Sequence, residues 1–407
     1  MTDTRIPIPK YFLPFFGMVA AIVPFAIDAY LPAIPTMAGY FDVDTVFMNN
    51  TISVFLLGYG VGQFLGGPMS DQVGRKTIGL GGMTLFMLCT LGIILSQSVN
   101  QIIALRFFQA IGGGFTSVII MSSMRDVYPA HEAGRKYSVV MMIMLIMPLL
   151  APIIGSQLLP FGWRTIFIAL FAFVLIAAVM FKFGIPETRV TDTKRVDFGS
   201  IARQFKQVVK KKNDEGMFAM FYVLAMSFNV GLLLSFVTNA SDIYQGYFGV
   251  STTMFPYFFG ANTTLMMVCI WYSMRRMKVK HPHRLFVRGN LIQFTFCTLT
   301  YLYVLFFEPQ LEVMTVLIIL SIGSMGLVNP NGFAVYISYY DRLSGSATSL
   351  SSLMLLAMGA ITGTMVGLFK DGSLVPFATA VFACALFSNI ISLSMPRPIG
   401  PFKKDEQ

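Results

Sequence analysis

The stretch GQFLGGPMSDQVGRKTIGL (62–80) decides the fold, because it joins two long apolar runs through a short polar turn. The runs on either side, near 47–69 and 77–96, are each long enough for a helix that crosses a hydrocarbon core of about 30 Å. Glycine at position 74 suits so short a turn, since glycine adopts backbone conformations that other residues avoid. The turn also brings acidic, basic and small residues together: Gly67, Asp71, Gly74, Arg75 and Lys76.

The composition of the whole chain agrees with a membrane location. Of its 407 residues, 55% are hydrophobic and only 12% are charged, whereas soluble domains carry about 25% charged residues. The sequence therefore predicts an all-α membrane protein. Apolar runs bounded by glycine, proline and charged residues predict twelve transmembrane helices, near 11–34, 47–69, 77–96, 101–123, 137–159, 163–184, 217–239, 251–274, 286–307, 312–338, 346–369 and 374–394.

One long polar connection, 185–216, separates the first six predicted spans from the last six. This repetition predicts two six-helix bundles, 1–184 and 217–407, joined by a cytoplasmic linker, with a short cytoplasmic tail after the second. We expect the linker to be a solvated tether; a short amphipathic helix at IARQFKQVVKKK (201–212) is the alternative. The N-terminal MTDTRIPIPK (1–10) has no small-residue cleavage site, so we expect the first helix to be retained.

Lys and Arg are distributed unevenly between alternate loops. With both termini inside, almost all of the 29 Lys and Arg residues fall in inner segments, and the outer loops hold only Arg164 and Lys370. This is the positive-inside pattern of a multi-pass membrane protein with both termini in the cytoplasm. Topology therefore accounts for the net charge of +10, and no nucleic-acid partner is needed to explain it.

Two ionisable residues remain well inside the predicted spans, Asp28 in FAIDAYLPAIP (25–35) and Arg106. A charge at the bilayer centre costs about 2.5–3.5 kcal/mol on insertion scales, so such residues usually mark a path for ions or substrate. We predict that Asp28 takes up and releases a proton, while Arg106 tunes it or holds an anionic group. A structural pair between two helices, or an Asp28 near the outer interface, are the alternatives. Pro32 and Pro35 are expected to bend or end the helix.

The sequence contains no pattern typical of an enzyme. The four cysteines stand singly in apolar segments and the three histidines lie in polar connections, so neither a metal site nor a catalytic cluster is indicated. A phosphate-binding G-x-x-x-x-G-K-[ST] motif is also missing from the sequence. We therefore expect no metal, no cofactor and no enzymatic activity.

The segment GPMSDQVGRK (67–76) resembles the signature loop between the second and third helices of the major facilitator superfamily. It lies between two predicted spans, on the side that the basic residues assign to the cytoplasm. LRFFQAIGGG (105–114), which contains Arg106 and Gln109, is similar to the fourth-helix motif associated with proton coupling in that superfamily. The resemblance implies the major facilitator fold and transport by alternating access.

MPLLAPIIGSQL (147–158) resembles the fifth-helix motif of the drug antiporters of this superfamily, commonly a Gly-Pro pair followed by Gly. Ala151 replaces the first glycine here, so only Pro152 and Gly155 match. Pro148 and Pro152 are expected to bend the helix, and Gly155 to permit close helix contact. An incidental kink is the alternative.

Three further segments, IDAYLPAIP (27–35), MRDVYP (124–129) and SGSATSL (344–350), resemble the bicyclomycin/chloramphenicol-resistance (Bcr/CflA) branch of twelve-helix drug:proton antiporters. The resemblance implies a monomeric multidrug efflux transporter of a bacterial plasma (inner) membrane that exchanges lipophilic molecules for protons, with membrane lipid around it. A proton-coupled exporter of a natural metabolite, such as an amino acid or sugar, is the alternative. A non-transporting sensor or assembly protein is a third possibility.

In this superfamily the inner loop stabilises the outward-open state. The resemblance implies that Asp71, Arg75 and Asp126 form a charge cluster near the start of the eleventh helix at Ser346, whose positive dipole end would favour Asp71. Gly67, Gly74 and Lys76 complete this conformational latch.

Polar and aromatic residues inside the spans are the candidates for a substrate site: Tyr30, Gln109, Asn229, Phe236, Asn239, Tyr257, Asn262 and Asn331. For each amide, an interhelical hydrogen bond is the alternative. Because no further charge lies well inside the spans, a lipophilic, neutral or weakly charged substrate fits better than a sugar phosphate or a dicarboxylate.

Overall fold

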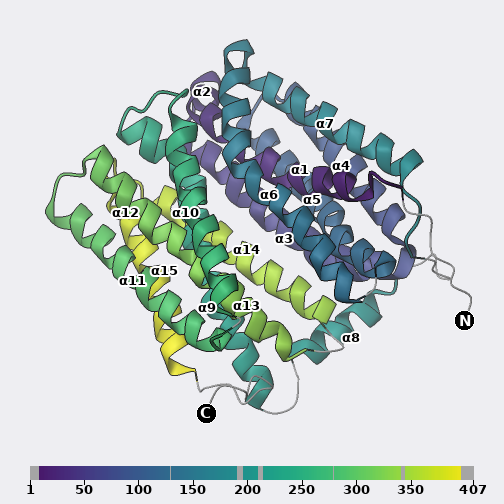
Figure 1. The fold of residues 1–407 in the computed structure, drawn as a ribbon. Coiled ribbons are helices and arrows are strands. Elements are labelled where there is room, and N and C mark those ends of the chain that lie inside the picture. Colours follow the sequence, from purple (N-terminus) through teal and green to yellow (C-terminus); the bar gives the residue numbers. More distant parts are fainter. Residues whose placement is uncertain are drawn as a thin grey trace, which may run out of the picture. The chain divides into compact units, whose positions relative to one another are not determined.

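A computed structural model of the protein describes residues 9–128, 130–189, 196–209, 214–277, 279–340 and 344–395. All regular elements within these residues are helical (Figure 1), so the predicted all-α class is confirmed. Eleven helical stretches in the described part are long and apolar enough to cross a membrane. The remaining predicted span, near 251–274, corresponds to α10 (Phe255–Arg276), in which Asn262, Thr263 and Ser273 reduce the apolar character.

The chain forms two compact units, 1–202 and 203–407, whose boundary falls within the predicted linker. The first unit contains, in chain order, α1 (Phe12–Asp28), the 3₁₀ turn η1 (Leu31–Ala33), α2 (Ile34–Tyr40), α3 (Thr45–Val73), α4 (Arg75–Leu95), α5 (Val99–Val127), α6 (Ala130–Leu158), the 3₁₀ turn η2 (Leu159–Phe161) and α7 (Trp163–Gly184). Within it, α5 packs against α3 and α4, α1 packs against α6 and α7, and α4 packs against α7.

Glycines allow α3 and α5 to approach each other closely. A Cβ atom on Gly58 would overlap the Phe107 carbonyl oxygen, and a Cβ atom on Gly62 would overlap that of Ile111. Side chains larger than hydrogen at these positions would therefore push the two helices apart. The same close contact fixes the position of α5, which carries Arg106 and Gln109.

The first span is broken where the prolines predict a bend. Helix α1 ends at Asp28, and the chain continues through η1, which contains Pro32, and α2, which contains Pro35. Proline cannot donate a backbone hydrogen bond, so each is placed in the first turn of its element, where no donor is required. The break places Asp28 at a helix end rather than in the middle of a helix.

The second unit follows α8 (Phe198–Val209), whose last turns belong to it. Its other elements are α9 (Asp214–Ser241), the π-helical turn η3 (Asp242–Tyr247), α10, α11 (Pro282–Phe306), α12 (Leu311–Gly323), the 3₁₀ turn η4 (Ser324–Leu327), α13 (Asn329–Ser338), α14 (Ser344–Leu368) and α15 (Val375–Ser394). Helix α12 packs against α10 and α11, α9 against α14 and α15, and α11 against α15. These neighbours repeat those of the first unit.

The expected solvated tether is wrong over α8. Helix α8 forms because its apolar residues recur at helical spacing, so that Phe205 and Val208 share one face and are buried. Val208 belongs to a hydrophobic cluster with Tyr222 and Tyr336, and its carbonyl accepts a hydrogen bond from the Tyr340 hydroxyl at 3.2 Å. Burial of this face outweighs the basic character of the segment.

Some of the predictions fall on residues outside the described part of the chain. These include several of the basic residues used to predict the orientation: Arg5, Lys278, Arg342, Arg397, Lys403 and Lys404.

Candidate functional site

Asp28 is the last residue of α1 and is enclosed by protein, with 6% of its surface exposed. Its carboxylate has no hydrogen-bond or ion-pair partner among the residues that the structure describes. Helix α6 lies directly against the next residue, Ala29, because a Cβ atom on Gly155 would overlap the Ala29 carbonyl oxygen. The predicted close contact at Gly155 is therefore present, and it lies beside Asp28.

Arg106 is fully buried in α5. Its Nη2 atom donates a hydrogen bond to the Ala26 carbonyl oxygen at 3.1 Å, and Nη1 donates to Gln109 Oε1 at 3.0 Å. The guanidinium also lies 4.4 Å from the ring centroid of Phe55 and 5.0 Å from that of Tyr30, which is the geometry of cation–π contacts. Its Nε atom has no partner among the described residues.

Arg106 therefore joins α5 to α1 through the main chain of Ala26 and not through the Asp28 side chain. No ion pair links the two predicted charges in the described structure. The alternative in which Asp28 and Arg106 form a structural salt bridge is not what the structure contains. The Arg106 guanidinium instead bonds to the carbonyl oxygen of Ala26, which precedes Asp28 by two residues in α1.

Two further candidates, Tyr30 and Gln109, surround the same guanidinium. Gln109 accepts from Arg106 and donates its own Nε2–H to Thr90 Oγ1 at 2.7 Å. The Tyr30 hydroxyl is 3.0 Å from Thr51 Oγ1. Both threonines escaped the sequence analysis, since a threonine in an apolar helix usually bonds to its own backbone and carries no distinctive signal.

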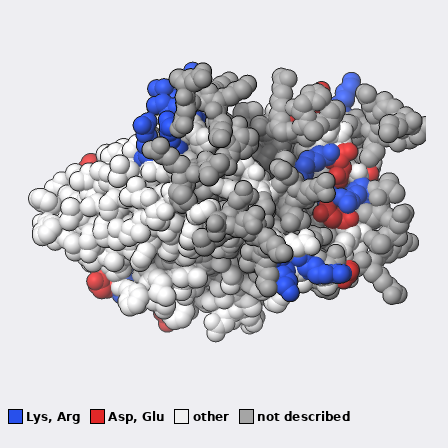
Figure 2. Space-filling view, turned by 90° about the horizontal axis from the view of Figure 1, so that it is seen from below, with Lys and Arg blue, Asp and Glu red and all other residues white. Residues whose placement is uncertain are grey.

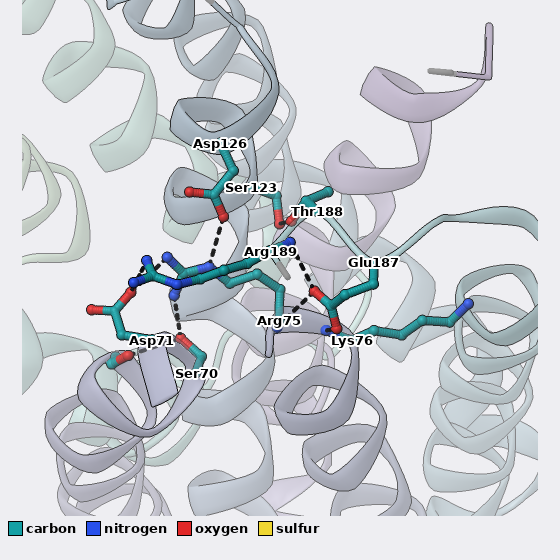
Figure 3. A network of polar contacts seen from close by, with 10 residues as sticks. Ser70, Asp71, Arg75, Lys76, Ser123, Asp126, Glu187, Thr188 and Arg189 are labelled. Atoms are coloured by element: carbon teal, nitrogen blue, oxygen red, sulfur yellow. Dashed lines mark hydrogen bonds and ion pairs between the residues drawn. The ribbon is translucent and has the colours of Figure 1, made fainter. Parts of the chain in front are cut away.

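The predicted latch residues come together at the turn between α3 and α4 (Figure 3). Arg75 is 3% exposed, and its guanidinium is 2.6 Å from Asp71 Oδ1, 2.9 Å from Asp126 Oδ2 and 2.7 Å from Ser70 Oγ. Ser70 in turn donates to the Gly67 carbonyl oxygen at 2.8 Å. Asp126 comes from the end of α5, so one arginine connects three helix ends.

Glu187, just after α7, completes this arrangement. Its two carboxylate oxygens accept the backbone N–H groups of Arg75 and Lys76, each at 2.9 Å. These are the first amides of α4, so the carboxylate caps the positive end of that helix. Gly74 has φ +99°, and an added Cβ atom would lie 2.7 Å from Glu187 Oε2. Glycine is thus required here both by the backbone and by the capping carboxylate.

Two more contacts tie the segment after α7 to the same turn. Lys76 Nζ donates to the Ile185 carbonyl oxygen at 2.8 Å, and Arg189 Nη1 is 3.0 Å from Asp71 Oδ1. We call Asp71, Arg75, Asp126, Glu187 and Arg189 the α3–α4 charge network. The sequence places Glu187 and Arg189 only in the predicted polar linker. The available signal was IPETR (185–189), an acid among basic residues directly after a span.

The proline pair predicted to bend the fifth span, Pro148 and Pro152, lies inside α6. The bend itself stays a prediction, as does the proximity of the latch to Ser346.

Most substrate candidates in the second unit are buried and hydrogen-bonded. Asn229 of α9 bonds to Asn290 Oδ1 at 3.1 Å and to Ser388 Oγ at 2.5 Å, which joins α9, α11 and α15. Asn331 bonds to Ser273 Oγ at 2.5 Å, and Asn239 bonds to the Gly363 carbonyl oxygen at 3.3 Å. Each amide makes the interhelical hydrogen bond that the alternative interpretation describes.

The aromatic candidates differ from each other. The Phe236 ring is buried and stacks on Phe259, with centroids 5.7 Å apart. Tyr257, in contrast, is 66% exposed. Asn262 is buried, and its Oδ1 has no partner among the described residues. A role in substrate binding stays a prediction for all of them.

Comparisons with known proteins agree with the fold. The model of the Major Facilitator Superfamily matches residues 16–364. A bicyclomycin resistance protein homolog of Haemophilus influenzae is 30% identical over 93% of this chain and 94% of its own length. A chloramphenicol resistance protein of Pseudomonas aeruginosa is 28% identical over 62% of this chain and 58% of its own length.

Solved structures are similar in fold. A POT family transporter in complex with 5-aminolevulinic acid has a TM-score of 0.76 at 15% identity, with 97% of this chain and 98% of that chain covered. A D-xylose-proton symporter has a TM-score of 0.72 at 13% identity, with 93% and 97% covered. These likenesses confirm the predicted helical transporter fold.

Proposed function

Since the chain belongs to the major facilitator superfamily, we propose that it exports lipophilic small molecules from bacteria in exchange for protons. Membership confirms the resemblance to the superfamily, and the bicyclomycin-resistance relative confirms the resemblance to that branch. The superfamily match also indicates a multi-pass transporter rather than an enzyme. We propose further that its substrates are drugs exchanged for protons, that both termini lie in the cytoplasm and that the protein is a monomer.

One observation carries the proton exchange, namely a buried carboxylate without a partner. Asp28 is 6% exposed and has no hydrogen-bond or ion-pair partner among the described residues. A carboxylate in this position can change between neutral and charged forms when its access to water changes. The proton leaves Asp28 when the site opens to one side of the membrane and another binds when it opens to the opposite side.

Arg106 supports this role without carrying a proton. Its guanidinium stays charged under physiological conditions and is fixed by the Ala26 carbonyl and by Gln109. No ion pair joins Arg106 to Asp28 among the described residues, so Asp28 can bind and release a proton without breaking a salt bridge. Exchange then follows if the drug binds when Asp28 is ionised and leaves when Asp28 is protonated.

The α3–α4 charge network supplies the mechanical part of the proposal. Alternating access requires one helix bundle to rock against the other largely as a rigid body. The network joins the ends of α3, α4, α5 and α7 through Arg75 and Glu187. We propose that it holds this end of the first unit together, so that its helices move as one body.

The aromatic rings around Arg106 and the names of the relatives support the proposed substrate class. Ring side chains of Tyr30, Phe55 and Phe167 surround Arg106, and aromatic surfaces favour lipophilic molecules. The relatives named above carry resistance to bicyclomycin and to chloramphenicol in their names. Export of a natural amino acid or sugar is the second candidate, because the same proton machinery would serve it.

The test is expression of the chain in an efflux-deficient bacterial host that is challenged with a chemically varied panel of antibiotics and dyes. We expect resistance to several lipophilic compounds, and an uncoupler should abolish their efflux. Resistance to none of them would reject the drug-export proposal in favour of the metabolite exporter. Resistance that persists in the presence of an uncoupler would reject proton exchange.

A further inference from the structure

The connection between α10 and α11 carries a group of exposed basic residues that transport does not explain. We call Arg275, Arg276, Lys280, Arg284 and Arg288 the α10–α11 basic patch. All five are exposed. Arg275 and Arg276 lie in the last turn of α10, while Arg284 and Arg288 lie in the first two turns of α11. The patch therefore covers the adjoining ends of two membrane helices.

The patch differs from the corresponding turn of the first unit in having no acidic residues near it in the sequence. No Asp or Glu occurs between residues 243 and 307. Lys280 and Arg288 have no ion-pair partner among the described residues. In the α3–α4 charge network, by contrast, Asp71, Asp126 and Glu187 neutralise the bases. Figure 2 shows a group of Lys and Arg atoms at the upper left and other Lys and Arg atoms on the right that are interspersed with Asp and Glu.

Stability of the fold does not explain the basic residues on α11. The N-terminal end of a helix carries a partial positive charge, so arginines in the first turns are mildly unfavourable there. Helix α11 begins at Pro282, after the His281 N-cap, and places Arg284 in that first turn. Backbone N–H groups at a helix start and arginine side chains both attract anions, and together they favour a phosphate group.

Aromatic side chains place the patch at the membrane surface. Trp271 and Tyr272, about one turn before the basic residues, are 51% and 46% exposed. The Arg275 guanidinium lies 3.9 Å from the Trp271 ring centroid, and Arg276 Nε donates to the Tyr272 hydroxyl at 3.2 Å. Exposed Trp and Tyr at the ends of membrane helices lie at the depth of lipid headgroups. The arginines attached to them therefore lie at the level of lipid phosphates.

We propose that the α10–α11 basic patch binds the headgroups of anionic phospholipids in the leaflet that it faces. A soluble anionic protein fits less well, because exposed Val279 (67%) lies between the basic residues and would meet acyl chains favourably. Anionic lipids are attracted to juxtamembrane clusters of this size. Each basic residue near such a surface changes binding by about fivefold.

The chain offers its own reporter for this interaction. It contains only two tryptophans, and Trp163 is buried and its Nε1 has no hydrogen-bond partner in the described structure. Trp163→Phe thus leaves Trp271, next to the patch, as the sole tryptophan. The full-length protein is reconstituted in bilayers, and quenching of Trp271 by brominated phosphatidylglycerol is compared with quenching by brominated phosphatidylethanolamine.

We expect the anionic lipid to be preferred at Trp271 by about fivefold or more at low salt. The preference should disappear in the variant Lys280→Gln/Arg288→Gln and persist in Lys280→Arg/Arg288→Lys. The matched control is Lys10→Gln/Lys182→Gln, which removes two exposed bases from the first unit and should keep the preference.

Equal quenching by both lipids would overturn the proposal. It would also be overturned if the patch variant and the control lost the preference for the anionic lipid to the same extent. Loss of a co-purified protein from Lys280→Gln/Arg288→Gln, with the lipid preference unchanged, would overturn it in favour of a protein partner. Thermal unfolding of each variant in detergent establishes that the compared proteins are folded.

Discussion

In the first unit α1 packs against α6 and α7, and in the second unit α9 packs in the same way against α14 and α15. The two units nevertheless hold different chemistry inside this shared arrangement. The first unit buries Asp28, Arg75 and Arg106. In the described part of the second unit the buried polar residues are amides, hydroxyls and His283, with Asn229, Asn290 and Ser388 as the clearest network.

The buried polar groups of the two units therefore suit different tasks: charged groups respond to proton binding, whereas neutral groups only hold helices together. A neutral hydrogen-bonded network joins helices at little cost and does not respond to proton binding. A buried charge costs more, and its stability depends on which groups are ionised. We therefore propose that proton binding acts on the first unit, while the second unit supplies helices that pack in the same way without carboxylates in their described core.

Asp28→Asn is expected to have the largest effect of the changes considered. It keeps the size of the side chain but removes the group that binds the proton, so proton-driven efflux should fall by about 100-fold or more. The measurement is substrate transport in inverted membrane vesicles energised by a pH gradient. Asn229→Asp, which introduces a carboxyl group into the second unit, should not restore it. Full proton-driven transport by Asp28→Asn would contradict the proposal that the proton binds in the first unit at Asp28.

Arg75→Gln should destabilise the first unit by about 2–3 kcal/mol, because it leaves Asp126 without its partner in a partly buried site. Asp71 is more exposed than Asp126, so the loss of its ion pair contributes less to the destabilisation. The matched control is Arg125→Gln, which removes an exposed positive charge next to Asp126 and should be nearly neutral. Thermal unfolding in detergent compares the two. Equal unfolding temperatures would mean that the α3–α4 charge network does not hold the helix ends together.

Glu187→Ala should cost about 1–2 kcal/mol, since two amides at the start of α4 lose their acceptor. Glu187→Gln keeps an acceptor oxygen without the charge, and it should recover about half of that loss. The same unfolding measurement, repeated with hydrogen exchange of the Arg75 and Lys76 amides, identifies the site of the change. Unchanged exchange at these two amides in Glu187→Ala would contradict the capping role.

Ser388→Ala should have the smallest effect, about 1 kcal/mol of stability, through the loss of hydrogen bonds to Asn229 and Asn290. Because no ionisable group takes part, the pH dependence of transport should be unchanged. A pH profile of efflux in vesicles provides this measurement. A shifted profile would show that the neutral network of the second unit participates in proton coupling. Proton dependence would then not be confined to the first unit.

The sequence predicts the helices well because hydrophobic length and the placement of basic residues are local properties. It also predicts which residues meet at 67–76, where neighbours in the chain are neighbours in space. The bond from Arg106 to the Ala26 carbonyl cannot be predicted in this way, because a main-chain acceptor has no side-chain signature. Glu187 is missed for a related reason, since its partners lie far away in the sequence. Helix α8 is predicted only as the alternative to a solvated tether, because its basic residues mask a narrow apolar face.

The cap on α4 has a consequence for the order in which the protein is made. Its acceptor, Glu187, lies 112 residues after the amide of Arg75 that it binds. A chain emerging from the ribosome must therefore insert its third, fourth, fifth and sixth spans before the start of its third span receives the capping carboxylate. A chain that ends before residue 187 therefore contains all six spans of the first unit but lacks the carboxylate that caps α4.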